Sequence, residues 1–225
     1  MEQSTVLTWL QGRHWIYSLL ATVYYQGPTE ELLANFPKEE ALQEFARRLG
    51  NSLVQEGVTE LYREWNARRE ERDYPGDLWA DYNRLFVGPG KLLAPPWESV
   101  YRSKERLVFG ESTLQVRSFY QRYGVEVKNR NKEPDDHFGL EMEFMAYLCQ
   151  EALEKIRAGA DAFPYIQASQ QFLEEHLGQW VPEFCGDVEE GAKTGFFRGV
   201  AKFTRGWLEC DREAVLECLE AMEDL

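Results

Sequence analysis

Apolar residues recur at helical spacing along almost the whole chain, and this period limits the possible fold more than any other feature. The first segment shows it on one face, with apolar side chains at Val6, Trp9, Leu10, Ile16, Leu19, Leu20 and Val23. Residues three or four apart share a helix face, so the spacing predicts amphipathic helices. The chain has no convincing stretch of alternating apolar and polar residues and no internal repeat. The sequence therefore predicts an all-α fold, with residues 1–225 forming a single globular domain of about eight to ten helices.

Capping and helix-breaking residues divide this pattern into separate helices. Gly27 and Pro28 end the first helix, and Thr29 caps a short second one. Pro37 suits the first position of a third helix, where its missing N–H costs nothing, and Pro75 ends a later helical segment. Further helices are predicted over residues 77–86, 113–124, 135–158, 163–180 and 195–223.

Two stretches interrupt the helical pattern. The segment "VGPGKLLAPPWESVY", residues 87–101, contains prolines and glycines that oppose a regular helix, so it predicts a long loop. Long irregular loops are often functional. The polar segment "VEVKNRNKE", residues 125–133, has no apolar period and is predicted to be a linker. It divides the chain into a possible N-terminal half, 1–124, and a C-terminal half, 134–225.

The charge of the chain excludes some partners. Lysine and arginine number 25 against 39 acidic residues, which gives a formal net charge of −14. Such a surface repels nucleic acid and anionic membrane and favours basic partners. The longest nearly apolar run, residues 15–25, is too short to cross a bilayer, and no secretory signal is recognisable. We therefore expect a cytoplasmic protein with no nucleic-acid partner and no stable membrane insertion.

The stretch "EPDDHFGLEMEFMAYL", residues 133–148, combines acids, a histidine and an apolar helical stripe. As a helix start, it places Pro134 in the first turn and Glu133, Asp135 and Asp136 near the positive end of the helix dipole. His137 lies four residues before Glu141, a spacing that can hold a metal ion, but this pair is only half of a site. A helical metal-dependent enzyme using these two residues is therefore an alternative, and no cofactor is predicted.

Two segments together resemble the signature regions of the TorD/DmsD family, cytoplasmic chaperones for the maturation of molybdenum redox enzymes exported by the twin-arginine pathway. The likeness covers residues 81–148, and the "APPW" loop, residues 94–97, is closer to the DmsD branch than to the nitrate-reductase chaperone branch. The first signature consists of Tyr82, Leu85, Phe86, Gly88, Pro89, Pro95, Pro96, Trp97, Ser99 and Tyr101. The second consists of Glu133, Pro134, Asp136, His137, Leu140, Glu141, Phe144 and Met145.

The resemblance implies a binding function rather than catalysis. The expected partner is the catalytic subunit of a molybdoenzyme, through an N-terminal signal with two consecutive arginines followed by an apolar segment. The chain is expected to act as a monomer or homodimer, and guanine nucleotide binding is not predicted. The expected peptide-binding residues are Trp79, Tyr82, Leu85, Phe86, Pro96, Trp97, Glu98, Tyr101, Glu133, Asp136 and His137.

Carboxylates and apolar residues would contact different parts of the signal peptide. Asp136, Glu133 and Glu98 would meet the arginines, whose planar guanidinium suits paired oxygens. The aromatic and aliphatic residues of the set would hold the apolar segment. His137 would orient Asp136 or bond the peptide backbone. A different alternative is a helical scaffold that binds the folded client without reading its signal.

Overall fold

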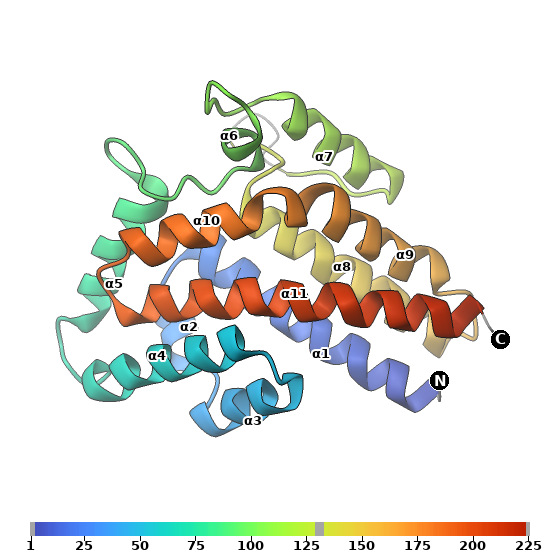
Figure 1. Cartoon of the computed structure of the whole chain (residues 1–225), viewed down its shortest axis with the longest axis horizontal. Helices are drawn as coiled ribbons and strands as arrows, with labels where there is room; N and C mark the ends of the chain where they lie inside the picture. The colour runs from blue at the N-terminus through green and yellow to red at the C-terminus, as the bar shows by residue number, and fades with distance from the viewer. Residues whose placement is uncertain (1–2, 129–132, 224–225) are drawn as a thin grey trace. The chain divides into compact units, whose positions relative to one another are not determined.

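The computed structural model describes residues 3–128 and 133–223 and confirms the all-α prediction (Figure 1). The π-helical turns η1, η2 and η3 continue neighbouring α-helices, so the described residues form ten continuous helices. Within these residues there is no β-strand, and the backbone has an isolated bridge between Trp97 and His137. In chain order the elements are α1 (Gln3–Ala21), η1 (Thr22–Gln26), α2 (Glu30–Ala34), α3 (Glu39–Leu49), α4 (Ser52–Arg68), α5 (Tyr74–Tyr82), η2 (Asn83–Val87), α6 (Glu98–Arg102), α7 (Glu111–Arg122), α8 (Phe138–Arg157), α9 (Phe163–Phe172), η3 (Leu173–Leu177), α10 (Gly178–Gly191) and α11 (Gly195–Glu223).

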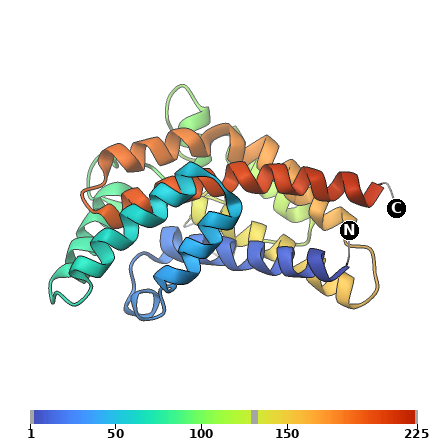
Figure 2. The same cartoon turned by 60° about the horizontal axis from the view of Figure 1, so that its bottom comes forward.

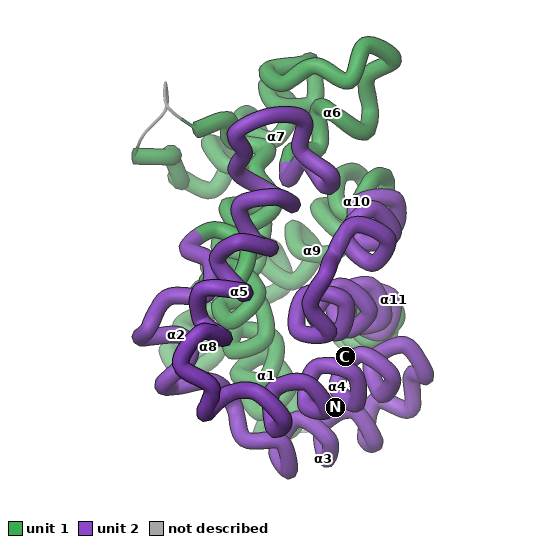
Figure 3. Tube along the Cα trace, turned by 90° about the vertical axis from the view of Figure 1, so that its left-hand side faces the viewer, with its two compact units in different colours: residues 1–25, 97–180, 211–225 green, residues 26–96, 181–210 purple. Residues whose placement is uncertain are grey.

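The chain forms two compact units, coloured separately in Figure 3. Unit 1 consists of residues 1–25, 97–180 and 211–225, and unit 2 consists of residues 26–96 and 181–210. Each unit draws on both of the sequence halves considered above, and the number of domains stays a prediction. Part of the predicted linker, residues 129–132, lies outside the described residues.

In unit 1, α1 packs along α8, and the two helices can be followed in Figures 1 and 2. Helix α8 buries apolar residues along most of its length, which agrees with its apolar stripe at helical spacing. Gly139 lets the start of this helix approach Tyr25 closely, because an added Cβ would lie 2.6 Å from the Tyr25 Cβ. This contact brings the end of η1 against the second signature.

In unit 2, α4 packs against the first part of α11 through two glycines. A Cβ added to Gly57 would lie 2.6 Å from the Gly199 carbonyl oxygen, and one added to Gly199 would lie 2.5 Å from the Gly57 carbonyl oxygen. The absence of side chains therefore allows direct backbone contact between the helices. Aromatic rings fill the core beside this contact, with Phe196 tilted against Trp65 and edge-on to Phe197.

Several helix boundaries correct the predictions from sequence. Pro37 lies two residues before α3, and Pro75 lies in the first turn of α5 instead of ending the preceding helix. That position tolerates proline because the first N–H groups of a helix have no partner within it. Pro134 also lies outside its helix, since His137 is the N-cap of α8. The predicted loop ends at Trp97, because α6 forms the last residues of the 87–101 segment.

Other predicted boundaries are confirmed. Thr29 caps α2, with its side-chain oxygen accepting a hydrogen bond from the backbone N–H of Leu32 at 3.2 Å. The final helix spans the predicted residues 195–223. Among residues 3–128 and 133–223, no helix combines the length and apolar character that a membrane crossing requires.

Candidate functional site

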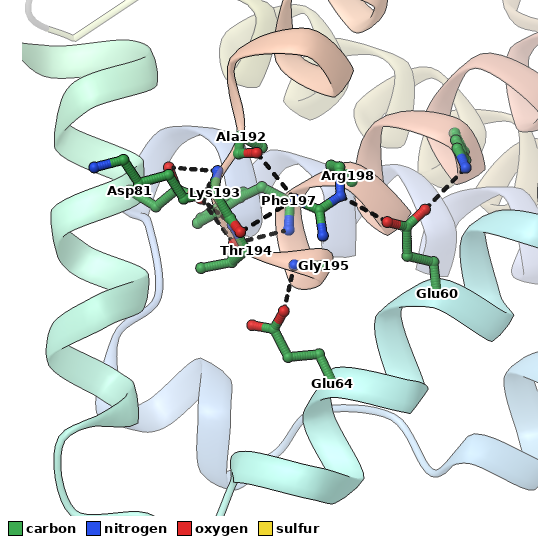
Figure 4. A network of polar contacts seen from close by, with 10 residues as sticks. Glu60, Glu64, Asp81, Ala192, Lys193, Thr194, Gly195, Phe197 and Arg198 are labelled. Carbon is green, nitrogen blue, oxygen red and sulfur yellow. Dashed lines mark hydrogen bonds and ion pairs between the residues drawn. The ribbon is translucent and has the colours of Figure 1, made fainter.

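Immediately before the first signature, the buried carboxylate of Asp81 anchors the start of α11 (Figure 4). Asp81 accepts hydrogen bonds from the backbone N–H groups of Lys193 at 3.0 Å and Thr194 at 2.8 Å, and from the Thr194 hydroxyl at 2.8 Å. Arg84 forms an ion pair with the same carboxylate at 2.6 Å and donates to the Gly191 carbonyl oxygen. These contacts hold the turn before α11 in place, so Asp81 and Arg84 stabilise the fold.

Two glutamates of α4 extend this network along α11, as Figure 4 shows. Glu64 accepts a hydrogen bond from the Gly195 N–H, which is unpartnered within the helix because it lies in the first turn. Glu60 pairs with Arg198 at 2.7 Å and with Lys202 at 2.8 Å. The carboxylates therefore join α5, α4 and α11 within unit 2.

The apolar residues predicted from the first signature lie mostly in the core of unit 2. Tyr82, Leu85 and Phe86 are all buried. The ring of Phe86 lies against Phe197, with ring centroids 5.8 Å apart. Trp79 is only partly buried and packs edge-on against Tyr82. Of these four predicted peptide contacts, only Trp79 presents appreciable surface, and Pro96 in the following loop is also buried.

The second signature forms an aromatic cluster in unit 1. The His137 ring contacts Trp97 on one side and Tyr25 on the other, with centroid distances of 5.9 and 5.2 Å. The indole N–H of Trp97 donates to the Glu133 carboxylate at 2.8 Å. Trp97 and Glu133 are partly exposed, and Tyr25 is exposed. The structure therefore brings three predicted residues together and adds Tyr25. No sequence pattern indicated Tyr25, because it lies more than 70 positions before Trp97.

A mostly apolar pocket of about 360 Å³ begins at Tyr25. Helix α8 contributes Leu140, Phe144 and Tyr147 to its wall, and Tyr120 comes from α7. Its remaining lining residues are Val125, Glu126, Val127, Lys128 and Glu143. Sequence reasoning assigned Leu140 and Phe144 to the buried stripe of α8 and missed their part in this pocket. The arrangement suits an apolar peptide segment.

His137 acts here as a neutral helix cap. Its Nδ1 accepts a hydrogen bond from the Gly139 N–H at 3.0 Å. Burial lowers the pKa of His137 to about 3, because the charged imidazolium loses its hydration. The ring therefore stays uncharged at neutral pH. It positions the start of α8 and spaces Trp97 from Tyr25.

The neighbouring acids Asp135 and Asp136 are buried, and each binds a group of the protein itself. Asp136 accepts a hydrogen bond from the Ser99 N–H at 2.7 Å and so holds the start of α6. Asp135 pairs with Arg117 at 2.7 Å. Burial raises the pKa of Asp136, while its hydrogen bonds with Ser99 lower it in part. These carboxylates order the backbone beneath the aromatic cluster.

Glu98 lies at the centre of a second buried polar group. Its carboxylate forms an ion pair with Arg102 and a hydrogen bond with the His176 Nδ1 at 3.0 Å. Tyr101, another predicted peptide contact, packs against Trp180 and lies beneath the Arg106 guanidinium. Glu98 is fully buried, so in this conformation it holds α6 to its neighbours and offers no surface to a peptide.

Glu141 is fully buried beside Glu98. Burial raises the pKa of Glu141 well above its usual value, and the neighbouring Glu98 charge raises it further. Burial and the Glu98 charge therefore both favour the protonated form of this side chain. In the described part of the chain, no group of three or more His, Cys, Asp and Glu side chains is arranged to hold a metal ion.

We expect Glu141→Gln to reduce the pH dependence of stability. A carboxyl whose folded pKa is raised stabilises the fold fully below its unfolded pKa of about 4.3, and this contribution is lost as pH rises through the folded pKa. Between these two pKa values, this group should lower the wild-type free energy of unfolding by about 1.4 kcal/mol per pH unit, and the variant should lack this decrease. Urea unfolding from pH 5 to pH 8 measures the difference. Glu154→Gln, at an exposed site on the same helix, should follow the wild-type curve, and parallel curves for all three proteins would contradict the assignment.

The sequence matches the model of a protein family described as the nitrate reductase delta subunit over residues 37–186. The chain is 24% identical to a chaperone protein TorD of Vibrio cholerae, over 98% of both chains. It is 27% identical to a probable Tat proofreading chaperone DmsD of Haemophilus influenzae, over 83% of both chains. The Tat proofreading chaperone DmsD of Salmonella typhi shares 30% identity over 55% of both chains. Relatives of both names are similar to this chain, so the assignment to the DmsD branch stays a prediction.

Proposed function

Because this chain belongs to the TorD/DmsD family of chaperones, we propose that it binds the twin-arginine signal peptide of a molybdenum oxidoreductase in the cytoplasm before export. Family membership makes it a chaperone and not an enzyme. The client is the catalytic subunit that carries the signal, and the chaperone acts as a monomer or homodimer.

The observation that carries the proposal is the aromatic cluster of Tyr25, His137 and Trp97 beside an apolar pocket. A signal peptide has an apolar segment that needs shelter from water before export. The pocket wall offers aliphatic and aromatic carbon, and the aromatic cluster adds the rigid, partly exposed Trp97 ring. Such surfaces hold peptides through a few anchoring side chains.

Burial energies support a moderate affinity. A fully buried leucine or phenylalanine contributes about 1.5–3 kcal/mol. Three or four anchors, less the cost of ordering a flexible peptide, leave about −8 kcal/mol, which corresponds to a dissociation constant near 1 μM. Exposed ion pairs add about 0–1 kcal/mol each. Apolar contacts therefore set the affinity, and charges set register and association rate.

We expect Trp97→Ala to raise the dissociation constant about tenfold, because it removes a large, partly exposed anchor from the aromatic cluster. Asp136→Asn should have a smaller effect at physiological salt, since Asp136 is buried under the site. Calorimetric titration measures both. Trp15→Ala is the control, because Trp15 is an exposed tryptophan of the same unit that belongs to neither the aromatic cluster nor the pocket. A larger effect from Asp136→Asn or from Trp15→Ala would contradict this division.

The proposed function is tested by titrating the folded chain with a twin-arginine signal peptide and, separately, with the catalytic subunit lacking its signal. Micromolar binding of the peptide supports the proposal. Binding of the shortened subunit alone would favour the scaffold alternative. A folded chain that binds neither would refute both.

A further inference from the structure

Two of the three carboxylates that the sequence offered to the arginines are buried and bind groups of the protein itself. Asp136 holds the Ser99 N–H, and Glu98 holds Arg102 and His176. Both are completely buried. An incoming guanidinium would have to break these contacts and open the core to reach them. Of the three predicted acids, only Glu133 retains a partly exposed carboxylate.

Accessible carboxylates lie instead on the rim of the apolar pocket. Glu126 and Glu143 are exposed, and both line the pocket. In the described ranges, neither forms an ion pair with a basic residue. Lys128 is the one basic residue among the described lining residues, so the negative charges outnumber it.

Tyr25 connects these acids to the second signature. Its phenol lies near both Glu133 and Glu143. Partial burial raises the pKa of Tyr25 most, and the charges of these two glutamates raise it further. The Tyr25 ring also contacts His137 and lines the apolar pocket. Glu133 and Glu143 therefore face a common aromatic surface within unit 1. Negative charge lies immediately beside an apolar pocket in this region.

We propose that Glu126, Glu133 and Glu143 form the subsite that receives the paired arginines of the signal, while the adjoining pocket takes its apolar segment. This inference rests on the proposed function and assigns the arginine contacts to acids other than Asp136 and Glu98. The order of chemistry in the signal, cationic and then apolar, matches an acidic rim beside a pocket of Leu140, Phe144 and Tyr147. We assign the twin-arginine signal to this site because its charge is complementary to the acidic rim.

Arginine suits this rim better than lysine for a geometric reason. Its planar guanidinium can donate to two carboxylates at once and can stack on the Tyr25 ring. Lysine presents a single strongly hydrated charge. The rim should therefore discriminate between the two residues as well as attract positive charge.

The test is calorimetry of wild type and the Glu126→Gln/Glu143→Gln variant with three synthetic signal peptides that carry twin arginine, twin lysine or twin glutamine. Wild type should bind the twin-arginine peptide most tightly. The double variant should lose about tenfold in affinity for that peptide, from two weakened ion pairs, and little for the twin-glutamine peptide. Its preference for arginine over lysine should largely disappear. Both replaced residues are exposed, so unchanged thermal unfolding should verify the fold.

Glu217→Gln is the matched control, because it removes one negative charge from an exposed site of unit 1 outside the pocket. It should keep the wild-type order of peptides. A double variant that binds the twin-arginine peptide as wild type does, with its arginine preference intact, would overturn this subsite and leave the proposed function standing. If wild type binds none of the peptides, the proposed function fails first.

Discussion

Asp81→Ala should lower the free energy of unfolding by about 3–5 kcal/mol, because it removes the acceptor that holds the turn before α11. The Lys193 and Thr194 N–H groups would lose their partner, and Arg84 would lose its counter-charge. Since whole domains are stable by only about 5–15 kcal/mol, the loss is a large share of the total. Urea unfolding followed by circular dichroism measures it.

Asp77→Ala is the control for this change, since Asp77 lies one turn earlier on α5 and pairs with Arg68 at an exposed site. Exposed pairs stabilise by about 0–1 kcal/mol, so this variant should remain close to wild type. Equal losses in the two variants would show that Asp81 has no special structural role. The comparison also separates loss of fold from loss of peptide contact in any binding assay on the first signature.

Asp211→Leu should have a comparable effect in unit 1, where it would leave the buried Arg13 without its counter-charge. The Asp211 carboxylate accepts from Arg13 Nε at 2.7 Å, from Arg13 Nη2 at 2.9 Å and from the Tyr17 hydroxyl at 2.5 Å. Breaking a buried pair by removing one partner costs about 3–5 kcal/mol. Denaturant unfolding at neutral pH is the appropriate measurement.

A double variant distinguishes an uncompensated charge from a general packing defect. Arg13→Leu together with Asp211→Leu removes both charges, and apolar replacement of a buried pair is often close to neutral. It should therefore be more stable than Asp211→Leu alone. Glu213→Leu, at an exposed position of α11, controls for the substitution itself. If the double variant lost as much stability as the single variants Arg13→Leu and Asp211→Leu added together, the charge explanation would be wrong.

The residues that identify the family thus serve structure and binding in different proportions. Asp136 holds the start of α6, and Leu85 and Phe86 fill a core. Trp97 retains the exposure that a peptide contact needs. In this chain the signature residues therefore build the region around the site as well as its contact surface. Substitutions in them must be tested for stability before binding.

Local sequence patterns determined the all-α fold and most helices, because the interactions behind them span only three or four residues. The cap at Thr29 and the extent of α11 were predicted on this basis and confirmed. Errors arose at Pro75 and Pro134, where a proline is compatible with either a helix start or a break. The two signatures also sufficed to identify the family, since both recur in order.

Only the tertiary structure decided which carboxylates are buried and which are accessible. Burial depends on contacts between distant segments, such as Asp81 with Thr194 and Asp211 with Arg13, and a helical period carries no information about them. The sequence presents Asp136 and Glu143 alike, as acids in one stretch. Folding buries Asp136 with a hydrogen bond from the Ser99 N–H and leaves Glu143 exposed on the rim of a pocket. The reason is that the cost of desolvating a charge is tolerated only where hydrogen-bonding partners compensate for it.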